Sequence, residues 1–200
     1  MSFGYQVLGF GAFPSREKGY CPAAAVYFDG AADYMTWTPL QAGSSNRKCT
    51  ISFWVKDTMT GFGASSPVLV AGPHNTNYAG VFITSAERWL SERYNSSDGT
   101  DAWNEQVNGF SRDISAWRHI VVSHDHTDGT AGDRVKIFIN GVLEAAQGSP
   151  TNPGTSQDLT LGSNTLHSIC KLGSTGVYFS GWLADIIYLD GQSIEAGDVA

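Results

Sequence analysis

The sequence predicts an all-β protein built as an antiparallel β-sandwich. Several segments alternate apolar and polar residues with the period of two that a half-buried strand requires. Asn140-Gly141 stands between two such segments and fits a type I′ hairpin turn, which needs positive φ at both residues. The composition agrees, because 23 glycines, 12% aromatic residues and only 16% charged residues favour short strands and tight turns over helices.

The individual strands follow from this alternation and from the turn residues between the segments. Residues 117–124 carry apolar side chains on both faces, which places this strand inside the sandwich with neither side fully in water. Residues 95–104 are polar and turn-forming, and we interpret them as a loop. The strands are expected at 26–28, 34–37, 49–56, 67–72, 79–84, 89–94, 117–124, 135–139, 142–143, 159–162 and 177–189. The side chains expected in the core are Ile51, Phe53, Val121, Val135, Ile137, Leu183 and Ile187.

Four segments resemble, in the right order, the concanavalin A-like lectin/glucanase (laminin G-like) family. Residues 27–35 read Tyr-Phe-Asp-Gly-Ala-Ala-Asp-Tyr-Met, and residues 49–56 read Cys-Thr-Ile-Ser-Phe-Trp-Val-Lys. Residues 117–122 and 133–141 form the central pair, and residues 179–191 contain Phe-Ser-Gly-Trp-Leu-Ala-Asp-Ile. The resemblance spans residues 26 to about 195. It implies the antiparallel jelly-roll β-sandwich of that family.

The sequences of residues 133–141 and 188–194 most resemble the branch of this family found in tailed-bacteriophage structural proteins. This resemblance implies a non-enzymatic virion structural protein, as a capsid decoration, head-fibre or tail-appendage subunit with other virion proteins as partners. It also leaves open whether the chain continues beyond Ala200. The alternative is a carbohydrate-binding module that recognises host-surface glycans. We expect a virion location in the first case.

The N-terminal segment forms an unusual apolar arm over residues 1–20, before a sandwich domain over residues 21–200. Its first 14 residues carry no charge, and an apolar arm free in water would be an aggregation hazard. It is therefore either an extra strand of its own sheet or an arm that docks on another chain, as in a homo-oligomer. The six large apolar side chains are Phe3, Tyr5, Val7, Leu8, Phe10 and Phe13.

Composition excludes several kinds of partner. The net charge is −7 and the 12 lysines and arginines form no run, so the sequence lacks the electrostatic footprint of a nucleic-acid-binding protein. No apolar run approaches the ~18 residues of a membrane helix. Three cysteines without a recognisable signal peptide predict buried, reduced thiols.

The search for catalytic residues predicts a protein that is not an enzyme. Family members that hydrolyse glycans carry paired carboxylates on one strand face, as a general acid and a nucleophile require. The nearest candidates, Asp185 and Asp190, are five residues apart and are expected on opposite faces of the last strand. We therefore expect no cleavage of polysaccharide and no required cofactor.

Two candidate binding sites remain. Asp125, Asp128 and Asp133 lie on or beside one loop and could hold calcium through carboxylate oxygens, while His124 and His126 could suit a softer metal. A solvated loop explains the same residues. Tyr78, Trp89 and Trp103 could form an exposed aromatic platform for sugar rings, although a tryptophan is more often a core residue.

Overall fold

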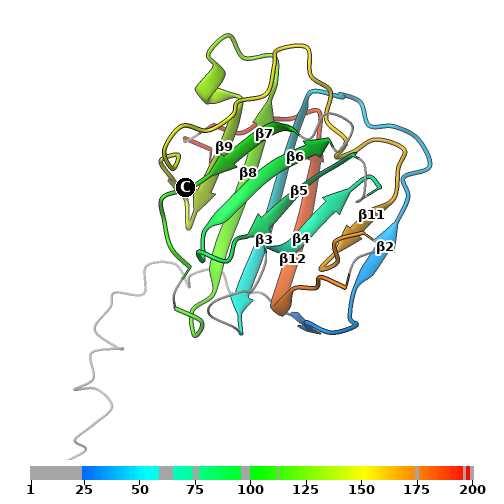
Figure 1. The fold of residues 1–200 in the computed structure, drawn as a ribbon, viewed down its shortest axis with the longest axis vertical. Coiled ribbons are helices and arrows are strands. Elements are labelled where there is room, and N and C mark those ends of the chain that lie inside the picture. The colour runs from blue at the N-terminus through cyan, green and yellow to red at the C-terminus, as the bar shows by residue number, and fades with distance from the viewer. Residues whose placement is uncertain are drawn as a thin grey trace, which may run out of the picture.

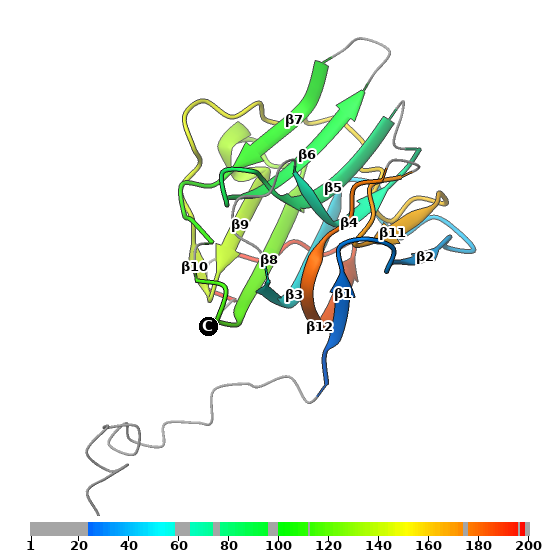
Figure 2. The same cartoon turned by 60° about the horizontal axis from the view of Figure 1, so that its bottom comes forward.

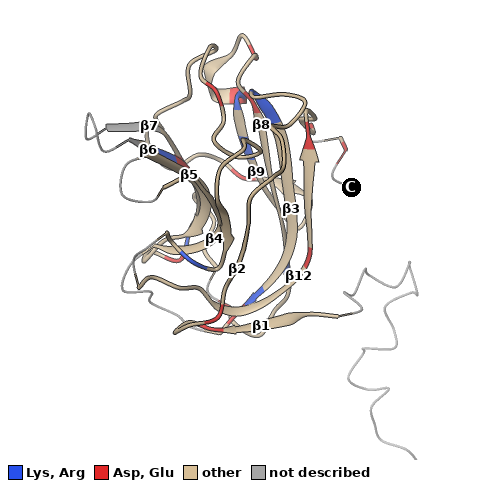
Figure 3. Cartoon of the chain, turned by 90° about the vertical axis from the view of Figure 1, so that its right-hand side faces the viewer, with Lys and Arg blue, Asp and Glu red and all other residues tan. Residues whose placement is uncertain are grey.

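The protein folds into two six-stranded antiparallel sheets that pack face to face (Figures 1 and 3). The computed structural model describes residues 24–58, 65–73, 77–95, 100–111, 113–173, 176–195 and 197–198. The predicted all-β sandwich is confirmed, and the helical content of the described residues is limited to one 3₁₀ turn, η1 (Ala131–Asp133). Among these residues, no helix has the length and apolarity needed to span a membrane.

Strands distant in sequence lie side by side in both sheets. The first sheet contains, in spatial order, β1 (Val26–Asp29), β12 (Ser180–Asp190), β3 (Lys48–Asp57), β8 (Arg118–Asp125), β9 (Val135–Ile139) and β10 (Val142–Leu143). The second sheet contains β2 (Met35–Trp37), β11 (His167–Ile169), β4 (Ser66–Ala71), β5 (Asn77–Ile83), β6 (Trp89–Asn95) and β7 (Thr100–Gln106). The chain passes repeatedly between the two sheets, which leaves β1 and β2 as edge strands near one another (Figure 2).

The core lies between the sheets and follows the predicted alternation. Ile51 and Phe53 point inward from β3, and Val81 and Ile83 point inward from β5; none of the four has an exposed side chain. The predicted core residues Val135, Ile137 and Leu183 belong to the same cluster. The hairpin turn between β9 and β10 is as predicted, with φ of 51° at Asn140 and 81° at Gly141.

Ile187 is not a core residue, because β12 contains a β-bulge. The pairing of β12 with β3 shifts between Ala184 and Ile187, and Asp185 has a φ of 47°. An extra residue in a strand reverses which side chains face inward beyond it. Leu183 and Tyr188 therefore face the interior, and Ile187 is 48% exposed.

Val121 is buried as predicted, but it lies on the outer face of the first sheet and outside the cluster that packs between the two sheets. The segment that follows β12 crosses this face. The Ile194 N–H donates to the Ser123 hydroxyl at 2.9 Å, and Lys136 pairs with Glu195 at 2.8 Å. This covering segment explains why β8 carries apolar residues on both faces.

Three further assignments were wrong. The 95–104 interval expected to be a loop overlaps β7, which pairs with β6. The strand β11 was not predicted. Residues 159–162 form a turn rather than a strand, in which Leu159 and Leu161 are buried. Apolar residues alone did not distinguish a strand from a loop that packs on the core.

The cysteine prediction is confirmed for the two thiols in the described residues. Cys49 and Cys170 are free and buried, and burial raises the pKa of the Cys49 thiol to about 12. Such thiols stay protonated and unreactive near neutral pH. Cys21 lies outside the described residues.

Candidate functional site

A cleft opens between the two sheets at the end of the sandwich where β2, β11 and β12 lie. Its mouth has a volume of about 210 Å³. Aromatic, amide, imidazole and carboxylate side chains meet there, together with two glycines that leave space between them. The lining residues are Trp37, Pro39, Gln41, Gly43, Gly162, His167, Tyr188 and Asp190.

Trp37 is the aromatic wall of this mouth. It lies on the edge strand β2, directly opposite His167 on β11, and its side chain is 40% exposed. The two rings stack with centroids 4.9 Å apart and an interplanar angle of 29°. The cross-strand partner therefore holds the indole in a fixed orientation while part of it remains open to solvent.

His167 is itself fixed by the backbone. The Gly162 N–H donates to Nε2 at 3.1 Å, so Nδ1 carries the proton that bonds the Thr165 carbonyl at 2.8 Å. Burial lowers the pKa of His167. The ring is therefore a neutral support for Trp37 rather than a charge in the site.

Two loops meet at the mouth through glycines. The Gly43 N–H donates to the Gly162 carbonyl at 2.9 Å. A Cβ at Gly43 would overlap the Asp190 carboxylate, and one at Gly162 would overlap the Tyr188 hydroxyl. Gly162 also has a φ of 77°, which glycine adopts without strain. Both positions require glycine because β12 side chains approach the loop backbone closely.

Asp190 supplies the charge of the mouth. The Ser44 N–H donates to Oδ2 at 2.5 Å and lowers the pKa of this carboxyl, so Asp190 is an anion at neutral pH. A carboxylate has about four acceptor positions, and the Oδ1 atom of Asp190 is buried without a hydrogen-bond partner. The exposed Gln41 adds an amide with donors and an acceptor.

The arrangement offers groups that can bind a ligand. Within the part of the chain that the structure describes, Asp190 is the only carboxylate that lines the cleft. Glycoside hydrolysis ordinarily needs two carboxyl groups, one of them with a raised pKa. The pKa of Asp190 is lowered instead.

The structure corrects most of the predicted aromatic platform. Trp89 and Trp103 are completely buried in the core, and the Trp89 indole N–H donates to the Ser111 hydroxyl at 3.0 Å. Neither ring can meet a ligand. Tyr78 faces outward from the second sheet but is only 9% exposed, and its hydroxyl donates to Glu92 at 3.0 Å.

The predicted calcium ligands do not form a group. Among the described residues, no three histidine, cysteine or acidic side chains are placed to share a metal ion. Asp125 instead pairs with Lys48 at 2.6 Å; burial opposes its ionisation, but Lys48 and Thr127 lower its pKa to about 2. Asp128 accepts the Thr130 N–H at 2.7 Å, as a turn residue does. Asp133 lies in η1.

His124 and His126 are internal structural groups. The Ser91 hydroxyl lies 3.2 Å from His124 Nε2, and His124 Nδ1 lies 3.3 Å from His126 Nε2. His126 Nδ1 then bonds the Gln157 carbonyl at 2.8 Å. This one-directional chain uses the ring nitrogens of two neutral histidines, so they offer no lone pair to a metal.

The six apolar side chains predicted as a docking arm lie outside the described residues. The cleft residues, in contrast, were not predicted as a site. Trp37 was assigned to a strand, and no local motif marked its exposure. A tryptophan next to the polar, glycine-containing loop at 41–48 was the one available signal.

Comparisons with known proteins agree with this architecture. The family described as "Concanavalin A-like lectin/glucanases superfamily" matches residues 29–197. A search of the curated proteins found no match.

Several solved structures share the fold at low sequence identity. A heptameric SAP-like pentraxin from Limulus polyphemus has a TM-score of 0.61 and 12% identity, with 88% of this chain and 79% of that chain covered. The CBM40 of the Ruminococcus gnavus IT-sialidase has a TM-score of 0.60 and 14% identity, covering 88% and 94%. Domain 4 of AbnA, a GH43 extracellular arabinanase from Geobacillus stearothermophilus solved with arabinotriose, has a TM-score of 0.54 and 15% identity, covering 88% and 79%.

Proposed function

Because the chain belongs to the concanavalin A-like lectin/glucanases superfamily, we propose that it is a carbohydrate-binding module whose site is the Trp37 cleft. One observation carries the proposal: a partly exposed indole is held rigidly at the mouth of a cleft beside an ionised carboxylate and an amide. Two domains with a similar fold support it. One is the CBM40 of a sialidase, and the other is an arabinanase domain solved with arabinotriose.

The chemistry of a sugar ring explains why these residue types fit. A pyranose has a face of C–H groups that packs on an aromatic ring and an edge of hydroxyls that needs polar partners. Trp37 offers the apolar face, and Asp190 with Gln41 offers the polar partners. Because His167 holds the indole, little side-chain entropy is lost when a ligand binds.

The module binds without cleaving, since one carboxylate with a lowered pKa cannot supply both an acid and a nucleophile. A role in a tailed-phage virion is compatible with glycan binding, because an outward-facing module would bring a particle to a host surface. That role stays a prediction, and the fold and the relatives described above do not support it further.

We expect Trp37→Ala to reduce glycan affinity by tenfold or more, because it removes a central aromatic contact worth at least ~1.4 kcal/mol. A glycan array identifies the ligand, and titration calorimetry measures the dissociation constant for both proteins. Trp182→Ala is the matched control: Trp182 is 38% exposed and packs on Tyr27 outside the cleft. Equal affinity of Trp37→Ala and wild type would place the sugar site elsewhere, and an array without any bound glycan would refute the proposed function.

A further inference from the structure

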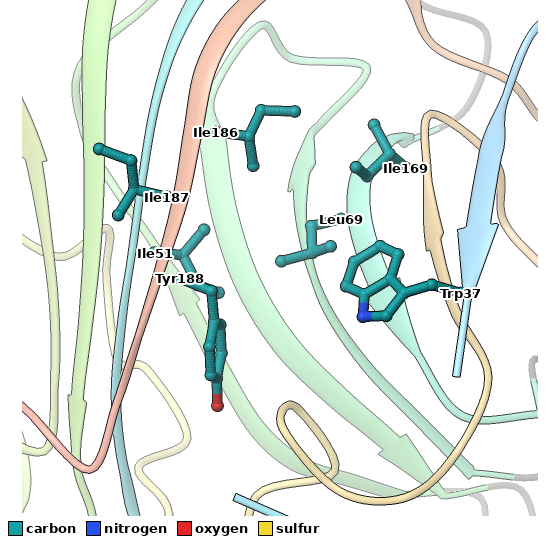
Figure 4. A pocket seen from close by; sticks show the side chains of 7 residues that line it. All are labelled: Trp37, Ile51, Leu69, Ile169, Ile186, Ile187 and Tyr188. Carbon is teal, nitrogen blue, oxygen red and sulfur yellow. The ribbon is translucent and has the colours of Figure 1, made fainter. Parts of the chain in front are cut away.

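Beside the mouth lies a second, inner pocket with apolar walls, which is also open to solvent. This pocket has a volume of about 240 Å³. It shares Trp37 and Tyr188 with the mouth, so the two compartments are neighbours. Figure 4 shows its lining, which comes from both sheets: Trp37, Ile51, Leu69, Ile169, Ile186, Ile187 and Tyr188.

The bulge in β12 opens this pocket. Beyond Ala184 two residues of β12 have no partner on β3, and the regular pairing resumes at Ile187. Ile186 is consequently 36% exposed at the lip instead of being packed between the sheets. On the other side, the short edge strand β2 leaves Trp37 as the only β2 residue that lines the pocket.

The lining determines which chemical groups the pocket accepts. Apart from the aromatic rings of Trp37 and Tyr188, which carry one polar group each, its side chains are aliphatic. The Tyr188 hydroxyl is buried and lies against the Cys49 thiol. A sugar hydroxyl placed here would lose its water and find few polar groups to replace it. An apolar group gains instead, and an apolar cavity of about 150 Å³ already accepts a benzene ring.

We infer that the cleft selects a glycan residue that carries an apolar substituent, such as an acyl ester or a short alkyl aglycone. This inference rests on the proposed function, and it divides the ligand between the two compartments. The sugar ring occupies the mouth against Trp37, with its hydroxyls toward Asp190 and Gln41. The substituent enters the inner pocket between Ile169 and Ile186. Neither an unsubstituted sugar nor a plain hydrocarbon uses both compartments.

Matched pairs of methyl and butyl β-glycosides of glucose, galactose, mannose and N-acetylglucosamine test the inference on the full chain by titration calorimetry. Each buried methylene strengthens binding about fourfold. We expect at least one butyl glycoside to bind tenfold or more tightly than its methyl counterpart. If no butyl glycoside does so, the inference is wrong, while glycan binding that depends on Trp37 would leave the proposed function intact.

Ile186→Asn should abolish the butyl preference, because it makes the lip polar at a position exposed enough to tolerate the change. Val142→Asn is the matched control, since Val142 is 62% exposed on β10 and does not line the pocket. A preference that survives Ile186→Asn contradicts the inference. Butanol that binds as tightly as the butyl glycosides would instead contradict the proposed sugar site. A third outcome is that wild type binds no butyl glycoside and Ile186→Asn changes the oligomeric state. That result would contradict the inference and show that another protein segment covers the cleft.

Discussion

Glu105 shows how burial sets the ionisation of a single residue. It lies on β7 opposite Ser91 and is only 7% exposed. Burial raises the pKa of its carboxyl from 4.5 to about 7. Between these two pH values the folded protein keeps the Glu105 proton that the unfolded chain releases. The stability from this proton is complete below pH 4.5 and is lost as the pH rises through about 7.

The variant Glu105→Gln is neutral at every pH and should remove this dependence. We compare the free energy of unfolding of the variant with that of wild type at two pH values. This difference should favour the variant by about 1 to 3 kcal/mol more at pH 8 than at pH 5. Urea denaturation at the two pH values measures the difference. The exposed Glu195→Gln variant is the control for loss of a carboxylate. If Glu105→Gln shows the same relative stability at both pH values, the Glu105 carboxyl is not buried in the way described.

The buried histidines act with the opposite sign. Burial lowers the pKa of His124 and of His126 below the usual 6.5. The unfolded chain therefore binds protons more readily in acid, and the stability from the neutral histidines is lost as the pH falls below 6.5. This loss is common to wild type and Glu105→Gln, so it cancels from the comparison between them.

Among the elements, β12 matters most for the site because it runs along the whole cleft. Its first half continues the regular pairing with β3, and its second half places Tyr188 and Asp190 inward after the bulge. The bulge depends on Asp185, whose φ of 47° lies in the left-handed region. Aspartate tolerates this conformation, whereas β-branched residues do not.

Asp185→Val should therefore lower the free energy of unfolding by about 1 to 2 kcal/mol more than Asp185→Gly does. Both variants remove the carboxylate, so their difference isolates the backbone conformation. Denaturant titration gives the free energies, and calorimetry with the bound glycan shows whether the cleft changes. Equal stability of the two variants would mean that the backbone at 185 is not left-handed in solution.

At the scale of the whole molecule, half of the exposed large apolar side chains in the described residues come from three strands. The strands are β1, β2 and β12, which lie near one another in Figure 2. These side chains are Val26, Tyr27, Met35, Trp37, Trp182, Ile186 and Ile187. Exposed apolar surface of this kind marks a site for a ligand or for another protein. The uncharged arm predicted over residues 1–14 precedes β1 in the sequence.

Deletion of residues 2–14 tests the arm. If the arm docks on a second copy, sedimentation velocity should show that the full chain self-associates and that the shortened chain is monomeric. The melting temperature of the shortened monomer should stay within about 4 °C of that of the full chain, which for this size corresponds to ~1 kcal/mol. Loss of thermal stability without any change of association would show that the arm is a strand of its own sheet.

The alternation of side chains and the turn residues determined the strands and the two-layer architecture from the sequence alone. Ile51, Phe53 and Leu183 were placed correctly because period-two patterning is a local property of a strand. The Asn140-Gly141 turn was correct for the same reason, since its φ angles depend on the two residues themselves. Local physics therefore accounts for most of the fold.

The tertiary structure alone decided which side chains are exposed and which meet. Trp103 looked like a loop residue but is buried, whereas Trp37 looked like an ordinary strand residue but is exposed. One bulged residue in β12 reversed the side that Ile187 faces, and alternation cannot reveal such a shift. The cleft joins Trp37 to Asp190 across 153 positions (190 − 37) of the chain. Contacts at that separation depend on how the sheets pack, and no local pattern encodes them.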